Sequence, residues 1–235
     1  MSSTDIIIVG GGPAGLTTAF LLRNKTVYVF EEHKELGIPK HCTGLVGLYT
    51  ASFFNKIAGK NVLDNKYNSI CYHIPCRSFC LYWNRPIAYR IKRPYLEQKL
   101  GDLIESIGHK LFLGKRIKAI SVGKNRVEDN KGKTYSYGKL VVAEGAKGFL
   151  TKNIRGKNSW RYIIGIQRRV RIKNAEPYAF HVFFPKILRD FFAWLVPIDH
   201  EEALIGYGLR MGQYINYDLI QCYVEKRTGL KTGSS

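Results

Sequence analysis

The sequence predicts an α/β protein in which a parallel βαβ unit is interleaved with an antiparallel β-rich part. An apolar run rich in β-branched residues, Asp5–Val9, is followed directly by a glycine-rich turn and a helical segment at 14–23. A second short apolar strand follows at 27–30. After residue 158 the chain has the pattern of long antiparallel strands, at 160–172, 178–184, 191–196 and 203–210.

The glycine-rich turn has the spacing Gly10-x-Gly12-x-x-Gly15 and opens the first helix through Pro13 and Ala14. Gly10 permits a tight turn, Gly12 lets the backbone approach a pyrophosphate, and Gly15 allows close packing of helix on strand. The N–H groups and positive dipole at the start of the helix attract phosphate. This turn therefore predicts a phosphate-binding site.

An acidic residue, Glu31, ends the second strand. A carboxylate at this position accepts hydrogen bonds from ribose hydroxyls and disfavours a 2′-phosphate. A glycine-rich turn without a ligand would leave Glu31 unexplained. Strand, turn, helix and acid together predict a Rossmann-like dinucleotide-binding unit.

The middle of the chain alternates between the two parts. Loop and short helix are expected over 34–60, and β structure over 67–92. Pro94 begins a helix that continues to Ile107. A strand is expected at 110–113, a hairpin over 117–137, a strand at 140–143 and a last helix over 217–226. We therefore predict a dinucleotide-binding domain of residues 1–66 and 93–157, and a β-rich domain of residues 67–92 and 158–235.

The charge is strongly positive, with a formal net charge of +19. Such a surface attracts polyanions, including anionic lipid headgroups and phosphorylated substrates. The basic residues are scattered and no nucleic-acid recognition module is evident, so no specific nucleic-acid partner is expected. Peripheral contact with a membrane is compatible with this charge.

Five cysteines show no paired framework: Cys42, Cys71, Cys76, Cys80 and Cys222. No C-x-x-C pair accompanies Cys71, His73, Cys76 and Cys80, so core or free thiols are favoured over zinc and no metal is predicted. A disulfide within this group is compatible with an oxidising or thermophilic setting.

No targeting or membrane-spanning segment is expected. Asp5 stands where a signal peptide carries positive charge, and the glycines interrupt the apolar run. No stretch approaches the ~20 apolar residues needed to cross a bilayer. We expect a cytoplasmic protein that is either soluble or peripheral at a membrane.

Several motifs resemble the FAD-dependent geranylgeranyl reductase family, flavoproteins with the p-hydroxybenzoate hydroxylase type of fold. The resemblance covers about residues 4–210. It rests on the segment from Asp5 to Leu16 with Glu31-Glu32-His33, on Leu36-Gly37-x-Pro39-x-x-Cys42-x-Gly44, on Tyr89-x-Ile91-x-Arg93, on Leu140-Val-Val-Ala-Glu-Gly-Ala146, and on Phe192-Ala-Trp194-Leu-Val196-Pro197.

The resemblance implies FAD as cofactor, a Rossmann-like FAD-binding domain and a β-rich substrate domain. Residues expected to bind FAD are Gly10, Gly12, Pro13, Ala14, Gly15, Glu31, Glu32, Cys42, Thr43, Gly44, Leu45, Arg93, the backbone near Ile117, Glu144 and Gly145. Cys42 either donates a proton or tunes the flavin, or else it is a small packing residue beside the flavin ring. Trp194 and Pro197 are expected at the substrate, although Trp194 is equally compatible with plain sheet core.

The implied activity is reduction of C=C bonds of an isoprenoid (geranylgeranyl) lipid in lipid biosynthesis, with NAD(P)H or ferredoxin as electron donor. An aromatic monooxygenase or halogenase of the same fold is an alternative, as is a non-catalytic homologue. Family members carry a later Gly-Asp-Ala-Ala-Gly element that binds the flavin. Gly101-Asp102 lies inside a predicted helix, so the sequence is expected to be truncated before that element.

Overall fold

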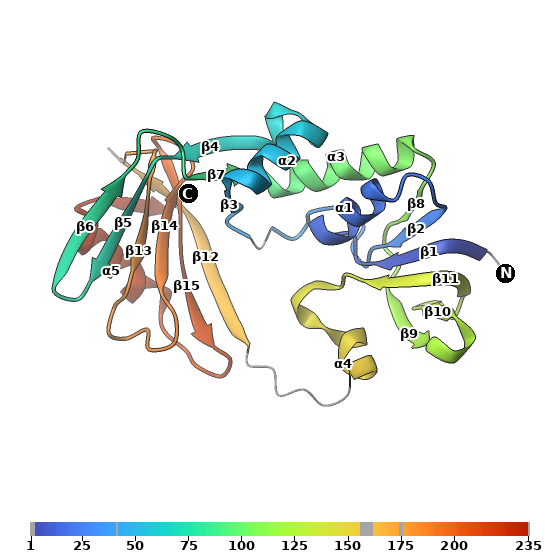
Figure 1. Ribbon diagram of the computed structural model, residues 1–235. Coiled ribbons are helices and arrows are strands. Elements are labelled where there is room, and N and C mark those ends of the chain that lie inside the picture. Colours follow the sequence, from blue (N-terminus) through green and yellow to red (C-terminus); the bar gives the residue numbers. More distant parts are fainter. Residues whose placement is uncertain (1–2, 41, 156–161, 174–175, 235) are drawn as a thin grey trace. The chain divides into compact units, whose positions relative to one another are not determined.

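The computed structural model describes residues 3–40, 42–155, 162–173 and 176–234 (Figure 1). The chain divides into two compact units, each built from two separate segments. The first unit comprises Met1–Lys40 and Arg93–Ser159, and the second comprises His41–Lys92 and Trp160–Ser235.

The first unit is built on a six-stranded sheet with the strand order β8-β2-β1-β11-β10-β9. Its strands are β1 (Ser3–Val9), β2 (Val27–Phe30), β8 (Lys110–Phe112), β9 (Ile117–Ser121), β10 (Arg126–Asp129) and β11 (Thr134–Val142). Its helices are α1 (Pro13–Leu21), α3 (Arg93–Ser106) and α4 (Phe149–Arg155), with single 3-10 turns at Val122–Lys124 and Gly145–Lys147. β1 runs parallel to β2, as the βαβ pattern predicts, and it also runs parallel to β11.

The apolar runs in the sequence form the buried centre of this sheet. Ile7, Ile8, Val27 and Val29 are fully buried, because layers cover both faces of the sheet. α1 and α3 pack together on one side (Figure 1). On the other side a cluster with Phe30 and Tyr135 at its centre includes Leu150 of α4.

The strand predicted at 140–143 is not separate from the hairpin before it. Residues 134–142 form the single strand β11, which pairs antiparallel with β10 over Thr134–Ser136 and parallel with β1 over Ser136–Val142. Gly138 lies where the strand passes close to the backbone of Asp5, and a Cβ there would meet the Asp5 carbonyl oxygen at 2.8 Å. The change of partner within one strand explains why two strands were expected.

The second unit contains a seven-stranded sheet of order β16-β12-β15-β14-β13-β5-β6 and a three-stranded sheet of order β3-β7-β4. The large sheet comprises β5 (Ser69–Ile74), β6 (Arg77–Tyr82), β12 (Ile163–Ile172), β13 (Ala179–Phe183), β14 (Ala193–Pro197), β15 (Glu202–Arg210) and β16 (Thr232–Ser234). The small sheet comprises β3 (Leu45–Gly47), β4 (Leu63–Tyr67) and β7 (Ala88–Ile91). Two helices, α2 (Leu48–Ala58) and α5 (Tyr217–Thr228), and a 3-10 turn at Lys60–Val62 complete the unit.

One face of the large sheet packs on α5. Ile205 and Tyr207 of β15 alternate inward and bury Ile220 and Val224 of the helix. The helix begins at Asn216, whose side chain accepts a hydrogen bond from the N–H of Asp218, and ends at Gly229 in the left-handed conformation. On the opposite face, the indole of Trp194 lies over Gly206 and the ring of Phe191 lies over Gly208.

Two expectations about this unit were wrong. Residues 42–66 group with the β-rich unit rather than the dinucleotide-binding one, because β3 and β4 both pair with β7. The sheet is also mixed rather than purely antiparallel, since β13 and β5 pair in parallel. The predicted boundary at 157–158 and the predicted strand start at 160 lie outside the described residues.

Candidate cofactor and substrate site

Close packing requires glycine at two positions of the glycine-rich turn, Gly10 and Gly15, but not at Gly12. Gly10 has φ +112°, and a Cβ there would collide with the carbonyl oxygen of Ala143. A Cβ on Gly15 would collide with the carbonyl oxygen of Gly10. Gly12 has ordinary backbone angles, and a Cβ there would meet no atom within 4 Å. Space is thus left beside Gly12 at the mouth of the helix.

The start of α1 is suited to an anion. Gly12 is the N-cap residue and supplies no side-chain cap, Pro13 occupies the first turn, and that turn holds no acidic residue. The N–H groups of Ala14 and Gly15 are therefore not capped by a side chain, and no carboxylate offsets the helix dipole. The turn fits the diphosphate of a dinucleotide.

Glu31 is held in place beside this turn. Its Oε2 accepts a hydrogen bond from the N–H of Gly11 at 2.7 Å, and its Oε1 accepts one from the N–H of His33 at 2.8 Å. The ring Nδ1 of His33 lies 2.6 Å from the same Oε1. A carboxylate oxygen accepts more than one hydrogen bond, so Glu31 keeps capacity for a ribose hydroxyl.

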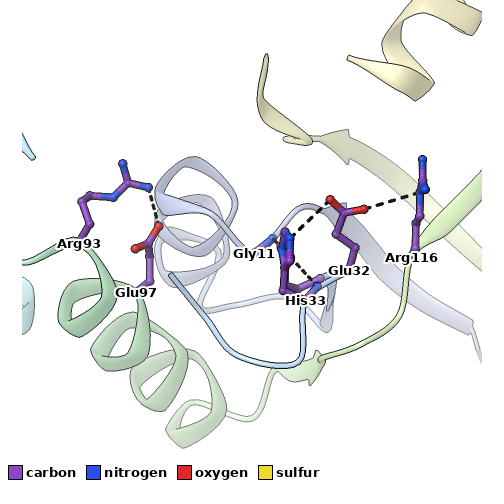
Figure 2. A network of polar contacts seen from close by, with 7 residues as sticks. Gly11, Glu32, His33, Arg93, Glu97 and Arg116 are labelled. Atoms are coloured by element: carbon purple, nitrogen blue, oxygen red, sulfur yellow. Dashed lines mark hydrogen bonds and ion pairs between the residues drawn. The ribbon is translucent and has the colours of Figure 1, made fainter. Parts of the chain in front are cut away.

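Glu32, the next residue, lies between two basic side chains, as Figure 2 shows. Its carboxylate oxygens are 3.9 Å from Nε2 of His33 and 3.7 Å from Nε of Arg116. These contacts place Glu32 at the edge of the glycine-rich turn. Contact between Glu32 and the cofactor stays a prediction.

Arg93 begins α3 and donates from Nη2 to Oε1 of Glu97 at 2.6 Å, one helical turn further on (Figure 2). Burial raises the pKa of Glu97, while the hydrogen bond and charge of Arg93 lower it and the charge of Glu31 raises it further. Sequence reasoning missed Glu97, although an acid four residues after an arginine is a recognisable helical pair. Whether Arg93 also reaches the cofactor stays a prediction.

The structure gives the other predicted residues of this unit local roles. The side chain of Ile117 is buried in the sheet core. Glu144 accepts hydrogen bonds from the N–H groups of Leu150 and Thr151 and from the Thr151 hydroxyl, at 2.6 to 2.8 Å. Burial acts to raise the pKa of Glu144, but these hydrogen bonds outweigh it and lower the pKa. Glu144 thus caps α4, and cofactor contact by Glu144 and Gly145 stays a prediction.

In the second unit the predicted flavin loop is tied to the sheet. Cys42 is a free, exposed thiol whose Sγ accepts a hydrogen bond from the N–H of Gly44 at 3.4 Å. Gly44 has φ +82°, and a Cβ there would collide with the carbonyl oxygen of Ile91. Leu45 opens β3 and packs against the cluster around Tyr67. The close approach to β7 fixes the backbone on which Cys42 is carried.

A single side-chain oxygen joins this loop to Trp194. The hydroxyl of Thr43 donates to Oε1 of Gln167 at 2.6 Å, and Nε1 of Trp194 donates to the same oxygen at 3.0 Å. The indole lies over Gly206, where a Cβ would meet its Cε2 at 2.6 Å. The structure therefore brings Thr43 and Trp194 together through Gln167, which sequence reasoning missed.

Pro197 has a structural role at the far end of β14. Its carbonyl oxygen accepts hydrogen bonds from the hydroxyl of Tyr67 at 2.6 Å and from Nδ2 of Asn65 at 3.2 Å. Substrate contact by Pro197 stays a prediction. Cys71 and Cys80 face each other across β5 and β6 and form a disulfide, whereas Cys76 is free.

The family model of the pyridine nucleotide-disulphide oxidoreductases matches residues 4–177. The chain belongs to this family. Among curated proteins, an uncharacterized protein of Methanocaldococcus jannaschii is 26% identical over 211 residues, which are 86% of this chain and 53% of that protein. The chain thus spans about half the length of this relative.

Several solved structures have a similar fold. A geranylgeranyl bacteriochlorophyll reductase-like protein from Thermoplasma acidophilum has a TM-score of 0.81 at 18% identity, over 99% of this chain and 66% of that one. A flavin-dependent brominase variant has a TM-score of 0.73 at 15% identity, over 99% of this chain and 66% of that one. A probable FAD-dependent monooxygenase from Pseudomonas aeruginosa has a TM-score of 0.66 at 14% identity, over 89% of this chain and 61% of that one.

These matches confirm the α/β fold predicted for this chain, with a Rossmann-like unit and a β-rich unit. The family and the flavoprotein neighbours indicate FAD as the cofactor. Among the described residues, no helix has the length and apolar character needed to cross a membrane.

Proposed function

We propose that this oxidoreductase uses FAD to reduce C=C bonds of an isoprenoid lipid of the geranylgeranyl type. The observation that carries the proposal is the link from Thr43 through Gln167 to Trp194, since it joins the predicted flavin loop to an aromatic sheet face. The likeness to a geranylgeranyl bacteriochlorophyll reductase-like fold supports the same reading.

The residues of the first unit would hold the cofactor. The N–H groups at the start of α1 would bind the diphosphate, and Glu31 would bind the ribose of the adenosine half. When bound, FAD supplies hydride transfer to one carbon of the double bond, using two electrons from a reduced donor such as NAD(P)H or ferredoxin. The protein contributes position and exclusion of water.

The residues of the second unit would bind the lipid and supply the proton. Phe192 and Trp194 meet edge to face with centroids 6.1 Å apart and present apolar surface to an isoprenoid chain. Gly206, beneath the indole, leaves room for the ring to lie flat on β15. We propose that Sγ of Cys42 donates the proton taken up by the second carbon and is then reprotonated from solvent.

Product analysis tests this function. The chain is loaded with FAD, reduced with dithionite without oxygen and mixed with a detergent-dispersed geranylgeranyl lipid. We expect the product mass to rise by the two hydrogens of each bond reduced, and the flavin absorbance to return. A parallel reaction with NAD(P)H in air tests the alternative, because an oxygenated or halogenated product formed only there would instead establish the monooxygenase or halogenase. Protein that stays colourless with added FAD would establish the non-catalytic alternative.

The same assay with variants of Gln167 tests the observation on which the proposal rests. Gln167→Leu removes the shared acceptor, so the rate should fall by roughly 10- to 100-fold through misplacement of loop and indole. Gln167→Glu keeps an acceptor oxygen and should retain more activity. Gln221→Leu, on α5 against the opposite sheet face, is the matched control and should react at the normal rate. Equal activity of Gln167→Leu and the control would refute the role of this link.

A further inference from the structure

Two segments of the second unit meet at one end of the large sheet. One is the connection from β13 to β14, residues 184–192, and the other follows β15, residues 211–214. The carboxylate of Asp190 joins them by accepting hydrogen bonds from Nη2 of Arg210 at 2.7 Å and from Nε2 of Gln213 at 3.4 Å. We call these two segments the sheet tip.

The sheet tip presents large apolar side chains to solvent. The exposed fractions of Ile187, Met211 and Tyr214 are 50%, 68% and 85%. The backbone that carries Ile187 is nevertheless anchored, because the next side chain, Leu188, is only 7% exposed and packs in the core beneath the sheet. Exposed apolar side chains that gather in one patch mark interaction surfaces, whereas single exposed ones are normal.

The charges of the sheet tip favour an anionic partner. Lys186 and Arg189 flank Ile187 and are both exposed. The one acid of the first segment, Asp190, is neutralised by Arg210. With a net charge of +19, a second copy of this chain would be repelled, whereas an anionic surface would be attracted.

We propose that the sheet tip docks onto an anionic lipid bilayer. Ile187, Met211 and Tyr214 would enter the boundary between headgroups and acyl chains, while Lys186 and Arg189 would contact lipid phosphates. Tyrosine suits this boundary because its ring is apolar and its hydroxyl remains hydrated.

A row of aromatic rings leads from the sheet tip to Trp194, which is proposed to contact the substrate. The ring centroids of Phe184 and Phe192 are 6.2 Å apart, and those of Phe192 and Trp194 are 6.1 Å apart. A lipid leaving the bilayer at the sheet tip would meet apolar surface along its path to Trp194. This delivery role rests on the proposed function, whereas docking itself does not.

Vesicle flotation of the full chain tests the docking. Phosphatidylcholine vesicles that contain phosphatidylglycerol should bind the protein, and pure phosphatidylcholine vesicles should bind it weakly. The variant Ile187→Ser/Met211→Ser/Tyr214→Ser should bind at least about tenfold less. Lys186→Gln/Arg189→Gln should weaken binding to the anionic vesicles by roughly 30-fold, about a factor of five for each charge removed.

Leu219→Ser is the matched control, because Leu219 is 57% exposed on α5 and should not affect binding. Circular dichroism checks that every variant is folded. The proposal is overturned if the normal chain does not float, if the triple variant floats as well as the control, or if the triple substitution converts a dimer into a monomer on a sizing column. Activity on detergent-dispersed lipid needs no vesicle, so docking and the proposed function fail separately.

Discussion

Gly12 is the residue at which the demands of folding and of cofactor binding separate. Its backbone angles suit any residue, and the space in front of it is empty of protein atoms. Gly12→Ala should therefore lower the free energy of unfolding by less than about 1 kcal/mol, the difference between glycine and alanine as N-caps. FAD affinity should fall by at least roughly tenfold, because the methyl group would occupy the place of the diphosphate.

Flavin fluorescence titration measures the affinity, and urea unfolding measures the stability. Gly47→Ala is a matched control, since Gly47 is the N-cap of α2, has nearly the same angles and also faces open space. Equal FAD affinity in the two variants would show that the diphosphate does not bind at this turn.

The sequence predicted the packing roles of Gly10 and Gly15 better than the contacts around Trp194. Gly10, Gly12, Gly15 and Glu31 act within one βαβ unit, so their spacing alone indicates their roles. Gln167 lies 124 positions from Thr43, and no local pattern relates the two. Glu144 has a role that its motif does not indicate, because its carboxylate caps the first turn of α4, and its contact with the cofactor stays a prediction.

At the scale of elements, most strands of the large sheet were predicted, whereas β3, β4 and β16 and the pairing of the strands were not. The alternation of residues 178–184 predicts a strand, but nothing in it reveals that the strand pairs in parallel with β5, whose last residue is Ile74. Residues 42–66 carry turn signals that suit either unit, and only their pairing with β7 assigns them. Long-range pairing is a property of the whole sheet rather than of a local pattern.

The parallel pair β5–β13 brings two histidines together. Nε2 of His73 lies 2.9 Å from Nδ1 of His181, and Nδ1 of His73 lies 2.8 Å from the Ser78 hydroxyl, which also accepts from Arg227. Burial, with the charge of Arg227, lowers the pKa of His73 to about 4, and burial, with His73, lowers the pKa of His181 to about 4. Both rings stack beside Phe183.

This pair should make stability depend on pH. Because the folded pKa values lie below the ordinary value of 6.5, the unfolded chain binds more protons as the solution is acidified. The stabilisation is complete above about pH 6.5 and is lost progressively toward pH 4. The free energy of unfolding should fall on the order of 2 kcal/mol between about pH 7 and pH 5.

Urea unfolding at several pH values measures this loss. His181→Phe keeps a ring against Phe183 but removes one titrating group, so its stability should vary less with pH. His200→Gln, in the exposed turn before β15, should behave as the unsubstituted chain does. An equal pH dependence in both variants would contradict the assignment.

At the scale of the whole molecule, 37 basic residues against 18 acidic ones impose self-repulsion on the folded chain. Salt screens this repulsion, so the protein should be more stable in about 0.5 M NaCl than in dilute buffer. A gain of about 1 kcal/mol would raise Tm by roughly 2–4 °C for a chain of this size. Differential scanning calorimetry measures the shift, with sucrose as an uncharged control. A Tm that falls with salt would show that attractive ion pairs dominate.

The interleaving of the two units has a consequence for biosynthesis. β1 at the start of the chain pairs with β11, where Val9 lies opposite Val142, and β5 pairs with β13, where Ser69 lies opposite Ala179. On the ribosome, β1 and β5 each find one partner soon, in β2 and β6, but each must wait for roughly a hundred or more further residues before its second neighbour emerges. Apolar strand edges are exposed during that wait, and such edges invite wrong pairing. Production of this protein should therefore depend on chaperones that shield nascent strands until translation nears its end.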